Sequence, residues 1–230
     1  MNEVAQAHVL EDKPATDTKT RILDTAEKLF GIKGFQATSL RDITRAAGVN
    51  LAAVNYHFHS KDSLIDAVIA RRIQPVNQRR LEMLRAAGPD ATLEQILTAF
   101  LKPVYEAPSD GIIPLLGRVL SNPDLFVDRV FLIHLKPVVV HFQEALRRVL
   151  PDLPPEEILW RLQFTVGTMT HNLLWGRIYP RITSGLCSIE DREALLERNV
   201  EFLAAGFRAP LPSKNVDTTP ADGSAPEQTS

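Results

Sequence analysis

The sequence contains a single cysteine, Cys187, among its 230 residues. One thiol cannot form an internal disulfide, and its isolation excludes metal sites built from several cysteines. It lies in the segment S-G-L-C-S without a nearby histidine, so nucleophilic catalysis by this thiol has little support. The sequence therefore predicts no disulfide framework.

Long apolar runs are also missing. None reaches the roughly 18–20 residues that a membrane span requires. The longest candidate, Val130–Phe142, is interrupted by His134, Lys136 and His141. Met1–Asp17 is polar and mixed in charge, without the apolar core of a signal peptide. We therefore expect a soluble, cytoplasmic protein.

The common catalytic and cofactor-binding motifs are absent as well. There is no G-x-S-x-G, no phosphate-binding loop and no dinucleotide fingerprint. The six histidines form no zinc pattern such as H-E-x-x-H. His134 and His141 could share a helix face, but no acidic residue stands at a supporting spacing. The sequence thus argues against an enzyme and predicts neither a metal nor a cofactor.

The net charge is small, −2, but it is unevenly distributed. Between Asp17 and Arg85 there are 12 Lys and Arg against 7 Asp and Glu, whereas residues 86–230 hold 13 against 18. A basic N-terminal segment can meet phosphates, although an asymmetry of this size needs a motif to support it.

Between two polar tails, nearly every segment of the chain has the apolar spacing of a helix. Residues 1–16 are expected to be a flexible tail, and residues 210–230, rich in Pro, Ser, Thr and Asp, a disordered one. No strand pair and no internal repeat is evident. Helices are predicted over Thr18–Lys33, Leu40–Ala47, Leu51–Phe58, Lys61–Arg85, Thr92–Tyr105, Ser109–Leu120, Pro123–Leu150, Pro154–Trp175 and Ile189–Phe207, and a loop over Tyr179–Ser188. Kinks or breaks are expected at Pro75, Pro103, Pro114 and Pro137. The predicted fold class is all-α.

The most informative run is Thr38–Leu64, TSLRDITRAAGVNLAAVNYHFHSKDSL. It holds two short predicted helices separated by only three residues. Ala46 and Ala47 allow the helices to approach closely, and Gly48 allows the positive φ that a tight turn often needs. Two short helices joined in this way form a helix-turn-helix. The outer face of Leu51–His57 would then be free to enter the major groove of DNA.

This run resembles the DNA-binding domain of the TetR family of repressors. The matching features are T-S-L-R-x-I at the first short helix, A-G-V at the turn and N-Y-H-F-x-S-K-x-x-L beyond it. The preceding R-I-L-x-x-A-E-x-L-F-x-x-x-G-F is similar to the family as well. The resemblance covers about residues 17–70. It implies a three-helix DNA-binding domain over 17–64 and a helical effector-binding and dimerisation domain over 65–209.

The resemblance also assigns DNA contacts. Phosphates would be met by Thr38, Ser39, Arg41, Tyr56, His57 and Lys61. Bases or the adjoining backbone would be met by Asn50, Leu51, Ala52, Ala53 and Asn55. Because the leucine and alanines carry no polar groups, they can only make apolar contacts, for instance with thymine methyls. Phe58 is expected in the core, and a solvated helix face is expected for Arg71, Arg72, Arg79 and Arg80.

For the C-terminal helices the resemblance implies a homodimer on a pseudo-palindromic double-stranded operator. Candidate dimer contacts are Phe164, Thr168, Leu195, Val200 and Phe202. Leu116–Trp175 resembles the PsrA-like branch of the family, which responds to long-chain fatty acids. Candidate ligand contacts are Phe100, Arg118, His134, Phe164, His171, Asn172 and Trp175, although a histidine in such a position is more often an ordinary core or surface residue than a ligand contact.

The sequence thus predicts a homodimeric repressor released from its operator by a small apolar ligand, such as a fatty acid, an acyl-CoA or an aromatic compound. The long helix after Lys61, bent near Pro75, would couple the two sites. The alternative is a helical enzyme or adaptor that has kept a helix-turn-helix-like bundle without binding an operator.

Overall fold

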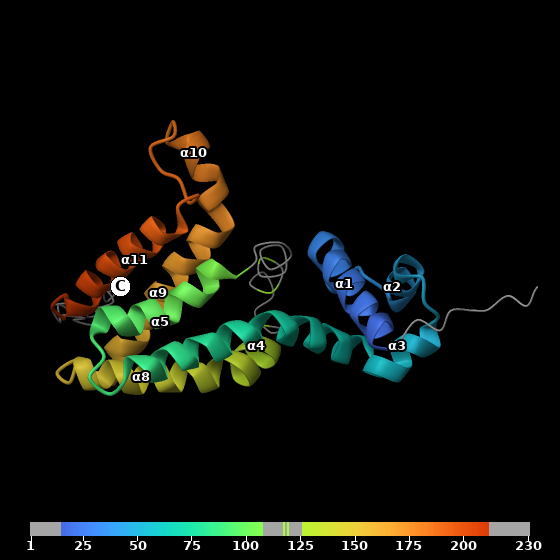
Figure 1. Cartoon of the computed structure of the whole chain (residues 1–230), viewed down its shortest axis with the longest axis horizontal. Coiled ribbons are helices and arrows are strands. Elements are labelled where there is room, and N and C mark those ends of the chain that lie inside the picture. The colour runs from blue at the N-terminus through green and yellow to red at the C-terminus, as the bar shows by residue number, and fades with distance from the viewer. Residues whose placement is uncertain (1–14, 108–116, 118, 120–125, 212–230) are drawn as a thin grey trace, which may run out of the picture.

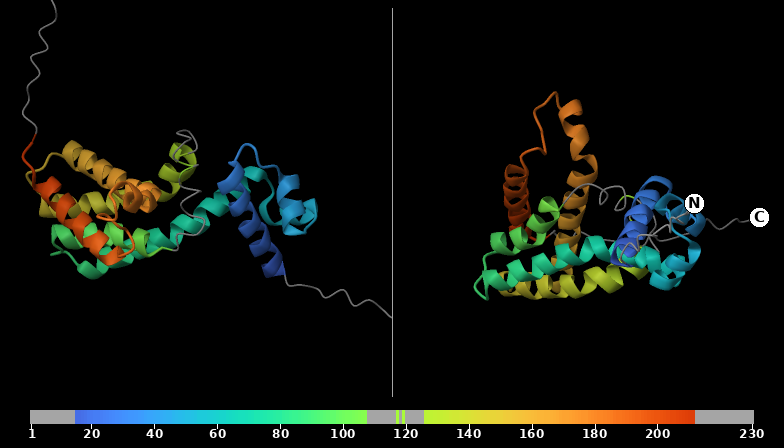
Figure 2. Two further views of the ribbon diagram at one scale, coloured as in Figure 1. Left: turned by 90° about the horizontal axis from the view of Figure 1, so that it is seen from above. Right: turned by 45° about the vertical axis from the view of Figure 1, so that its right-hand side comes forward.

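The computed structural model describes residues 15–107, 117, 119 and 126–211. Most of both predicted tails, most of the predicted helix Ser109–Leu120, Pro114 and Arg118 lie outside these residues. Every regular element of the described residues is a helix, which confirms the all-α prediction. Three N-terminal helices lie at one end and a helical bundle at the other, joined by the long helix α4 (Figures 1 and 2).

The N-terminal domain consists of α1 (Ala15–Lys33), α2 (Leu40–Ala47) and α3 (Leu51–Phe58). Its apolar core includes Ile22, Phe30, Ile43 and Val54, none of which is exposed. Phe58 is also buried there, which confirms its expected place in the core. The three helices therefore pack as one small unit that leaves the outer face of α3 uncovered.

Helix α4 (Lys61–Ala87) belongs to both domains. Leu64 and Val68 are buried in the N-terminal core, whereas Leu81 and Leu84 pack against the C-terminal core. The helix continues through Pro75 without a break. The predicted boundary between residues 64 and 65 therefore falls inside one continuous helix.

The C-terminal bundle is built on α5 (Leu93–Glu106), which packs against both α4 and α11 (Arg192–Arg208). Beside them run α8 (Lys136–Val149) and α9 (Pro155–Trp175). The predicted helix over Pro123–Leu150 is instead divided: η1 (Phe126–Leu135) is a π-helix that leads directly into α8. Pro137 stands at the start of α8, where its missing N–H does not interrupt a helix interior.

The segment predicted as a loop, Tyr179–Ser188, is not entirely irregular. It follows a single 3₁₀ turn, η2 (Gly176–Ile178), and begins with one helical turn, α10 (Tyr179–Ile182). Pro180 suits the first turn of a helix, and the Thr183 hydroxyl donates to the Tyr179 carbonyl at 2.6 Å. In the part of the chain that the structure describes, no helix has the length and apolarity to cross a membrane.

Candidate functional site

Local capping fixes the turn between α2 and α3. Ser39 caps α2 in a capping box, in which its hydroxyl accepts from the Asp42 N–H and the Asp42 carboxylate accepts from the Ser39 N–H at 3.0 Å. Gly48 ends α2 in the left-handed region, at φ 64°. Asn50 then caps α3, because its Oδ1 accepts from the Ala53 N–H at 2.8 Å. The orientation of α3 is thus set by residues within the turn itself.

Most of the predicted DNA contacts share one exposed surface at the start of α2 and along α3. The exposed members are Ser39, Arg41, Asn50, Leu51, Ala52, Asn55 and Tyr56. Ala53, His57 and Lys61 are half-buried beside them. The Tyr56 side chain is 77% exposed, and its ring meets the His57 ring edge-on at 5.0 Å between centroids. This arrangement offers hydroxyl, imidazole, ammonium and guanidinium groups, all of which can donate to phosphate oxygens.

Thr38 does not belong to this surface. Its side chain is fully buried, and its hydroxyl donates to the Gly34 carbonyl at 2.8 Å. The predicted phosphate contact by this side chain does not fit its position, because the hydroxyl already donates a hydrogen bond to a carbonyl just after α1. The Lys61 ammonium donates to the Gln36 carbonyl at 3.3 Å, which holds it near the loop that precedes α2.

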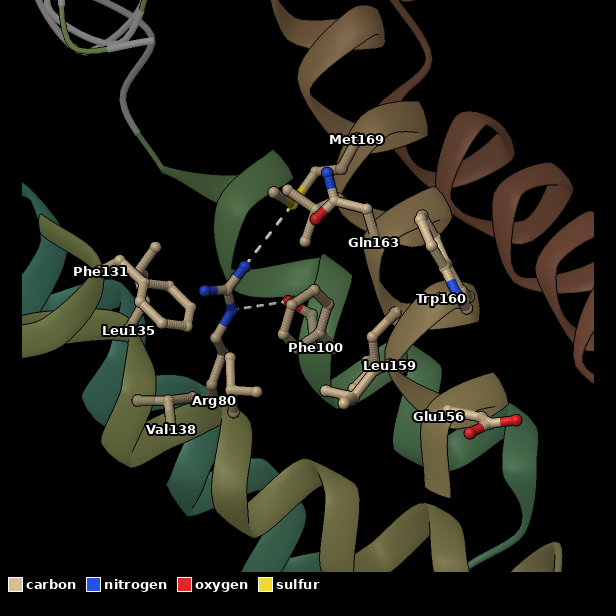
Figure 3. Close-up of a pocket in the computed structure, with 13 residues that line it drawn as sticks. Arg80, Phe100, Phe131, Leu135, Val138, Glu156, Leu159, Trp160, Gln163 and Met169 are labelled. Carbon is tan, nitrogen blue, oxygen red and sulfur yellow. Dashed lines mark hydrogen bonds between the residues drawn. The ribbon is translucent and has the colours of Figure 1, made fainter. Parts of the chain in front are cut away.

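A cavity of about 510 Å³ lies between α4, α5, η1, α8 and α9. This is within the roughly 300–1,000 Å³ that small-molecule sites occupy. Its lining is apolar except for Arg80, Glu156 and Gln163 (Figure 3). Phe100, at its inner side, is 4% exposed, whereas Leu159 and Trp160 are 50% and 59% exposed. The cavity therefore has a buried end at α4 and α5 and an accessible side along α9.

Arg80 lies at the buried end and is only 5% exposed. Its Nε donates to the Phe100 carbonyl at 2.8 Å and its Nη1 to the Asn77 Oδ1 at 3.2 Å. The guanidinium also lies 4.2 Å from the centre of the Phe100 ring. The predicted solvated face is therefore wrong for Arg80. The prediction of a solvated face also missed the ion pairs of the two preceding arginines. Arg71 pairs with Asp24 and Arg72 pairs with Glu27, both on α1.

Of the predicted ligand contacts, only Phe100 lines this cavity. His171 is exposed and stacks on Trp175, which is itself 53% exposed. Asn172 donates to Asn199 at 3.1 Å, on the side of α9 that faces α11. Phe164 lines a separate hollow on α9 and α11, and His134 is half-buried on η1 without lining the cavity. Arg118 lies outside the described residues.

The π-helix η1 contacts both domains. Its Val130 is buried in the N-terminal core, and its Phe131 and Leu135 line the cavity. Next to Val130, Arg129 forms ion pairs with Asp66 at 2.7 Å and with Asp62 at 2.9 Å, both on the first turns of α4. Hydrogen bonds to these carboxylates raise the pKa of Arg129. One short element therefore touches the cavity and the base of the N-terminal domain together.

The outer face of α9 and α11 exposes large apolar side chains. Phe164 is 61% exposed and Phe202 is 71% exposed, and Trp160 stacks on Phe164 at 6.1 Å between ring centroids. Among the other predicted dimer contacts, Thr168 and Leu195 are half-buried. Val200 is 7% exposed and belongs to the core, so the predicted role as a dimer contact does not fit its position.

Two family models match separate parts of the chain. Residues 22–68 match the model for bacterial regulatory proteins of the tetR family, and residues 98–206 match the model for tetracyclin repressor-like C-terminal domains.

Curated relatives share the N-terminal part. The chain is 33% identical over 95 residues to the uncharacterized HTH-type transcriptional regulator TtgW of Pseudomonas putida, covering 41% of this chain and 69% of that protein. It is 37% identical over 93 residues to the HTH-type transcriptional repressor KstR2 of Rhodococcus jostii. That match covers 37% of this chain and 45% of the relative, so the chain spans less than half of that repressor.

Solved structures show the same fold over most of the chain. A TetR-family transcriptional regulator from Bordetella parapertussis superposes with a TM-score of 0.61 at 20% identity, covering 85% of this chain and 98% of that one. The TetR-family regulator PfmR from Thermus thermophilus gives 0.55 at 20% identity, covering 84% and 100%.

Proposed function

The chain belongs to the TetR family of bacterial regulatory proteins, and on that premise we propose that it is a homodimeric repressor whose operator binding is controlled by a small, largely apolar ligand. Its family consists of transcriptional regulators rather than enzymes. The observation that carries the proposal is the pairing of an uncovered α3 surface with an apolar cavity in the same chain. An adaptor without operator binding would need neither.

DNA binding is proposed to use α3 as the recognition helix. Capped at Asn50, it would present Asn50 and Asn55 to bases and Leu51 and Ala52 to thymine methyls. Arg41, Tyr56 and Lys61 would hold phosphates on either side. Because two copies of α3 must reach half-sites about one helical turn apart, the proposal requires a dimer. The exposed face of α9 and α11 is the proposed pairing surface.

A gel-shift titration tests DNA binding, with the DNA directly upstream of the protein's own gene as the probe. Log affinity is expected to fall linearly with log salt concentration. Lys61→Ala should weaken binding to every sequence alike and reduce the salt slope by about 1 per protomer, about 2 for the proposed dimer, since each protomer loses a phosphate contact. Lys102→Ala, a half-buried lysine on α5 like Lys61 on α4, is the matched control and should change neither quantity. Salt-independent binding, or no binding, would contradict the proposal.

The ligand is proposed to enter the cavity on α4, α5, η1, α8 and α9. Its lining suits an apolar body such as the acyl chain of a fatty acid or acyl-CoA, or an aromatic ring system. A thermal-shift screen with acyl and aromatic compounds tests this proposal, because a ligand that binds only the folded state raises the melting temperature. The absence of stabilisation by every compound at saturating concentration would count against it.

A further inference from the structure

We propose that Arg80 anchors the carboxylate of an amphipathic monocarboxylic acid, whose apolar body fills the cavity. This inference rests on the proposed ligand-sensing function and specifies the chemistry that the cavity selects. It names the head group, the residue that binds it and the end of the cavity where it lies. Neither the family models nor the relatives assign a role to this arginine.

The first observation is a buried charge without a counter-charge. Arg80 is 5% exposed, and no carboxylate of the described residues lies within ion-pair distance of it. Buried arginines are ordinarily paired. Arg161 shows the difference in the same chain: it is 7% exposed, pairs with Glu157 at 3.4 Å and donates to the Phe207 carbonyl at 2.6 Å. Arg161 therefore has a complete structural role, and Arg80 has room for a partner.

The second observation is the number of donors. A guanidinium has five N–H groups in one plane. Bonds to the Phe100 carbonyl, the Asn77 Oδ1 and the Met169 sulfur, the last at 3.5 Å, use three of them. The sulfur is a weak acceptor. Each Nη thus keeps an N–H without an acceptor among the described residues, and a carboxylate can accept from both Nη atoms at once.

The third observation is where the guanidinium points. Figure 3 shows it directed into the cavity, with Phe131 and Leu135 on one side and Phe100 and Met169 on the other. Burial keeps water from this end and lowers the pKa of Arg80 to about 10, so it is still charged at neutral pH. An anion bound here would meet a cation that water does not screen.

The lining selects the class of anion. A single buried cation can neutralise one negative charge, so a monoanion fits better than a phosphate dianion. Apart from Glu156 and Gln163, the remaining lining is aliphatic and aromatic, and it includes Val138, Val139, Leu162 and Val166. A carboxylate at Arg80 therefore places an unbranched or aromatic body along these side chains.

Calorimetric titration of the full chain with decanoate and with 1-decanol tests the inference, because the two probes differ only in the head group. We expect the wild type to bind decanoate at least about 10-fold more tightly than 1-decanol. Arg80→Gln should weaken decanoate binding by about 10- to 100-fold and leave 1-decanol binding within about threefold. The retained alcohol binding shows that the variant is folded. Arg79→Gln, an exposed neighbour on α4, should change neither affinity.

Arg80→Lys is the second variant, since it keeps the charge but loses the planar fork. Its preference for decanoate should persist and be weaker than in the wild type. Equal binding of both probes by the wild type, binding of neither, or an unchanged preference in Arg80→Gln would overturn the inference. The gel-shift assay reports separately on the proposed function. Operator binding without decanoate selectivity refutes only the head-group assignment, whereas selectivity without operator binding refutes only the repressor.

Discussion

Arg80 keeps its charge where burial opposes it. Burial lowers the pKa of Arg80 to about 10, well below its ordinary value. Because the folded-state value is the lower one, the unfolded chain holds this proton more tightly. The resulting destabilisation is complete below about pH 10 and disappears as the pH rises towards that ordinary value. At neutral pH it is on the order of 3 kcal/mol. A buried cation without a counter-charge fits a ligand anchor better than a structural role.

Arg80→Met is therefore expected to leave the free energy of unfolding unchanged or to raise it, since an apolar side chain of similar length replaces a buried unpaired charge. Urea denaturation without added ligand measures this. Arg161→Met is the matched control, and it should destabilise by at least about 2 kcal/mol because Glu157 and two carbonyls of α11 lose their partner. A comparable loss in Arg80→Met would identify Arg80 as structural.

His134 makes stability depend on pH in the acidic range. Burial lowers its pKa below 6.5, and the nearby Asp66 opposes that shift. The unfolded chain therefore takes up this proton first as the pH falls, and stability drops below about pH 6.5. His134→Gln should show a smaller loss of melting temperature between pH 7.5 and pH 5 than the wild type. His141→Gln, an exposed histidine on α8, is the control and should behave like the wild type. Identical slopes in all three proteins would refute this assignment.

At the scale of elements, η1 connects the cavity to the N-terminal domain, as α4 also does. Phe131 and Leu135 line the cavity, whereas Arg129 holds Asp62 and Asp66 of α4. The His134 carbonyl accepts from the Asn77 Nδ2 at 2.8 Å, and the same Asn77 accepts from Arg80. A ligand that bonds to Arg80 would therefore act on η1 through both a hydrogen-bonded and an apolar contact, in addition to any movement of α4.

Arg129→Gln tests this coupling, because it removes both ion pairs to α4. Decanoate affinity should stay within about twofold of the wild type, since Arg129 does not line the cavity. The loss of operator affinity on adding decanoate should shrink from the 5- to 150-fold that is usual for allosteric coupling. Gel-shift titrations with and without decanoate measure it, with the exposed Arg148→Gln on α8 as the control. An unchanged ratio would show that coupling bypasses Arg129.

The elements of the DNA-binding domain could be predicted from the sequence because their ends are set locally. Ser39, Gly48 and Asn50 cap α2 and α3 through bonds that reach no further than four residues, and both helices have the predicted bounds. The ligand site was not predictable in the same way. Arg79 and Arg80 look alike in the sequence, and only the tertiary structure, which brings Phe100 of α5 and Met169 of α9 to Arg80, distinguishes the buried one.

At the scale of the whole molecule, the predicted dimer contacts fall on both the outer and the inner sides of α9 and α11, for a related reason. Helical periodicity shows that α9 and α11 each have an apolar side, but both sides carry apolar residues. Phe164 and Phe202 face outward, whereas Val200 faces α5 and the core. Which side is outward depends on how the bundle closes, and that information is spread over contacts far apart in the sequence. Large exposed aromatics rarely stand together without a partner surface.

Phe164→Asp is expected to convert the proposed dimer into a monomer, because it places a charge in the proposed pairing surface. Light scattering after size exclusion measures the mass, and the gel-shift assay should show a large fall in operator affinity, since one recognition helix reaches only one half-site. Decanoate binding should be retained, because Phe164 does not line the ligand cavity, and this retention excludes misfolding.

Leu186→Asp is the matched control for this prediction. Leu186 is 89% exposed, lies between α10 and α11 in the sequence, and does not line the hollow that contains Phe164. The same charge introduced there should leave both the mass and the operator affinity unchanged. If Phe164→Asp stays dimeric, the pairing surface lies elsewhere on the bundle. If it becomes monomeric with full operator affinity, a single recognition helix suffices and the requirement for a dimer is wrong.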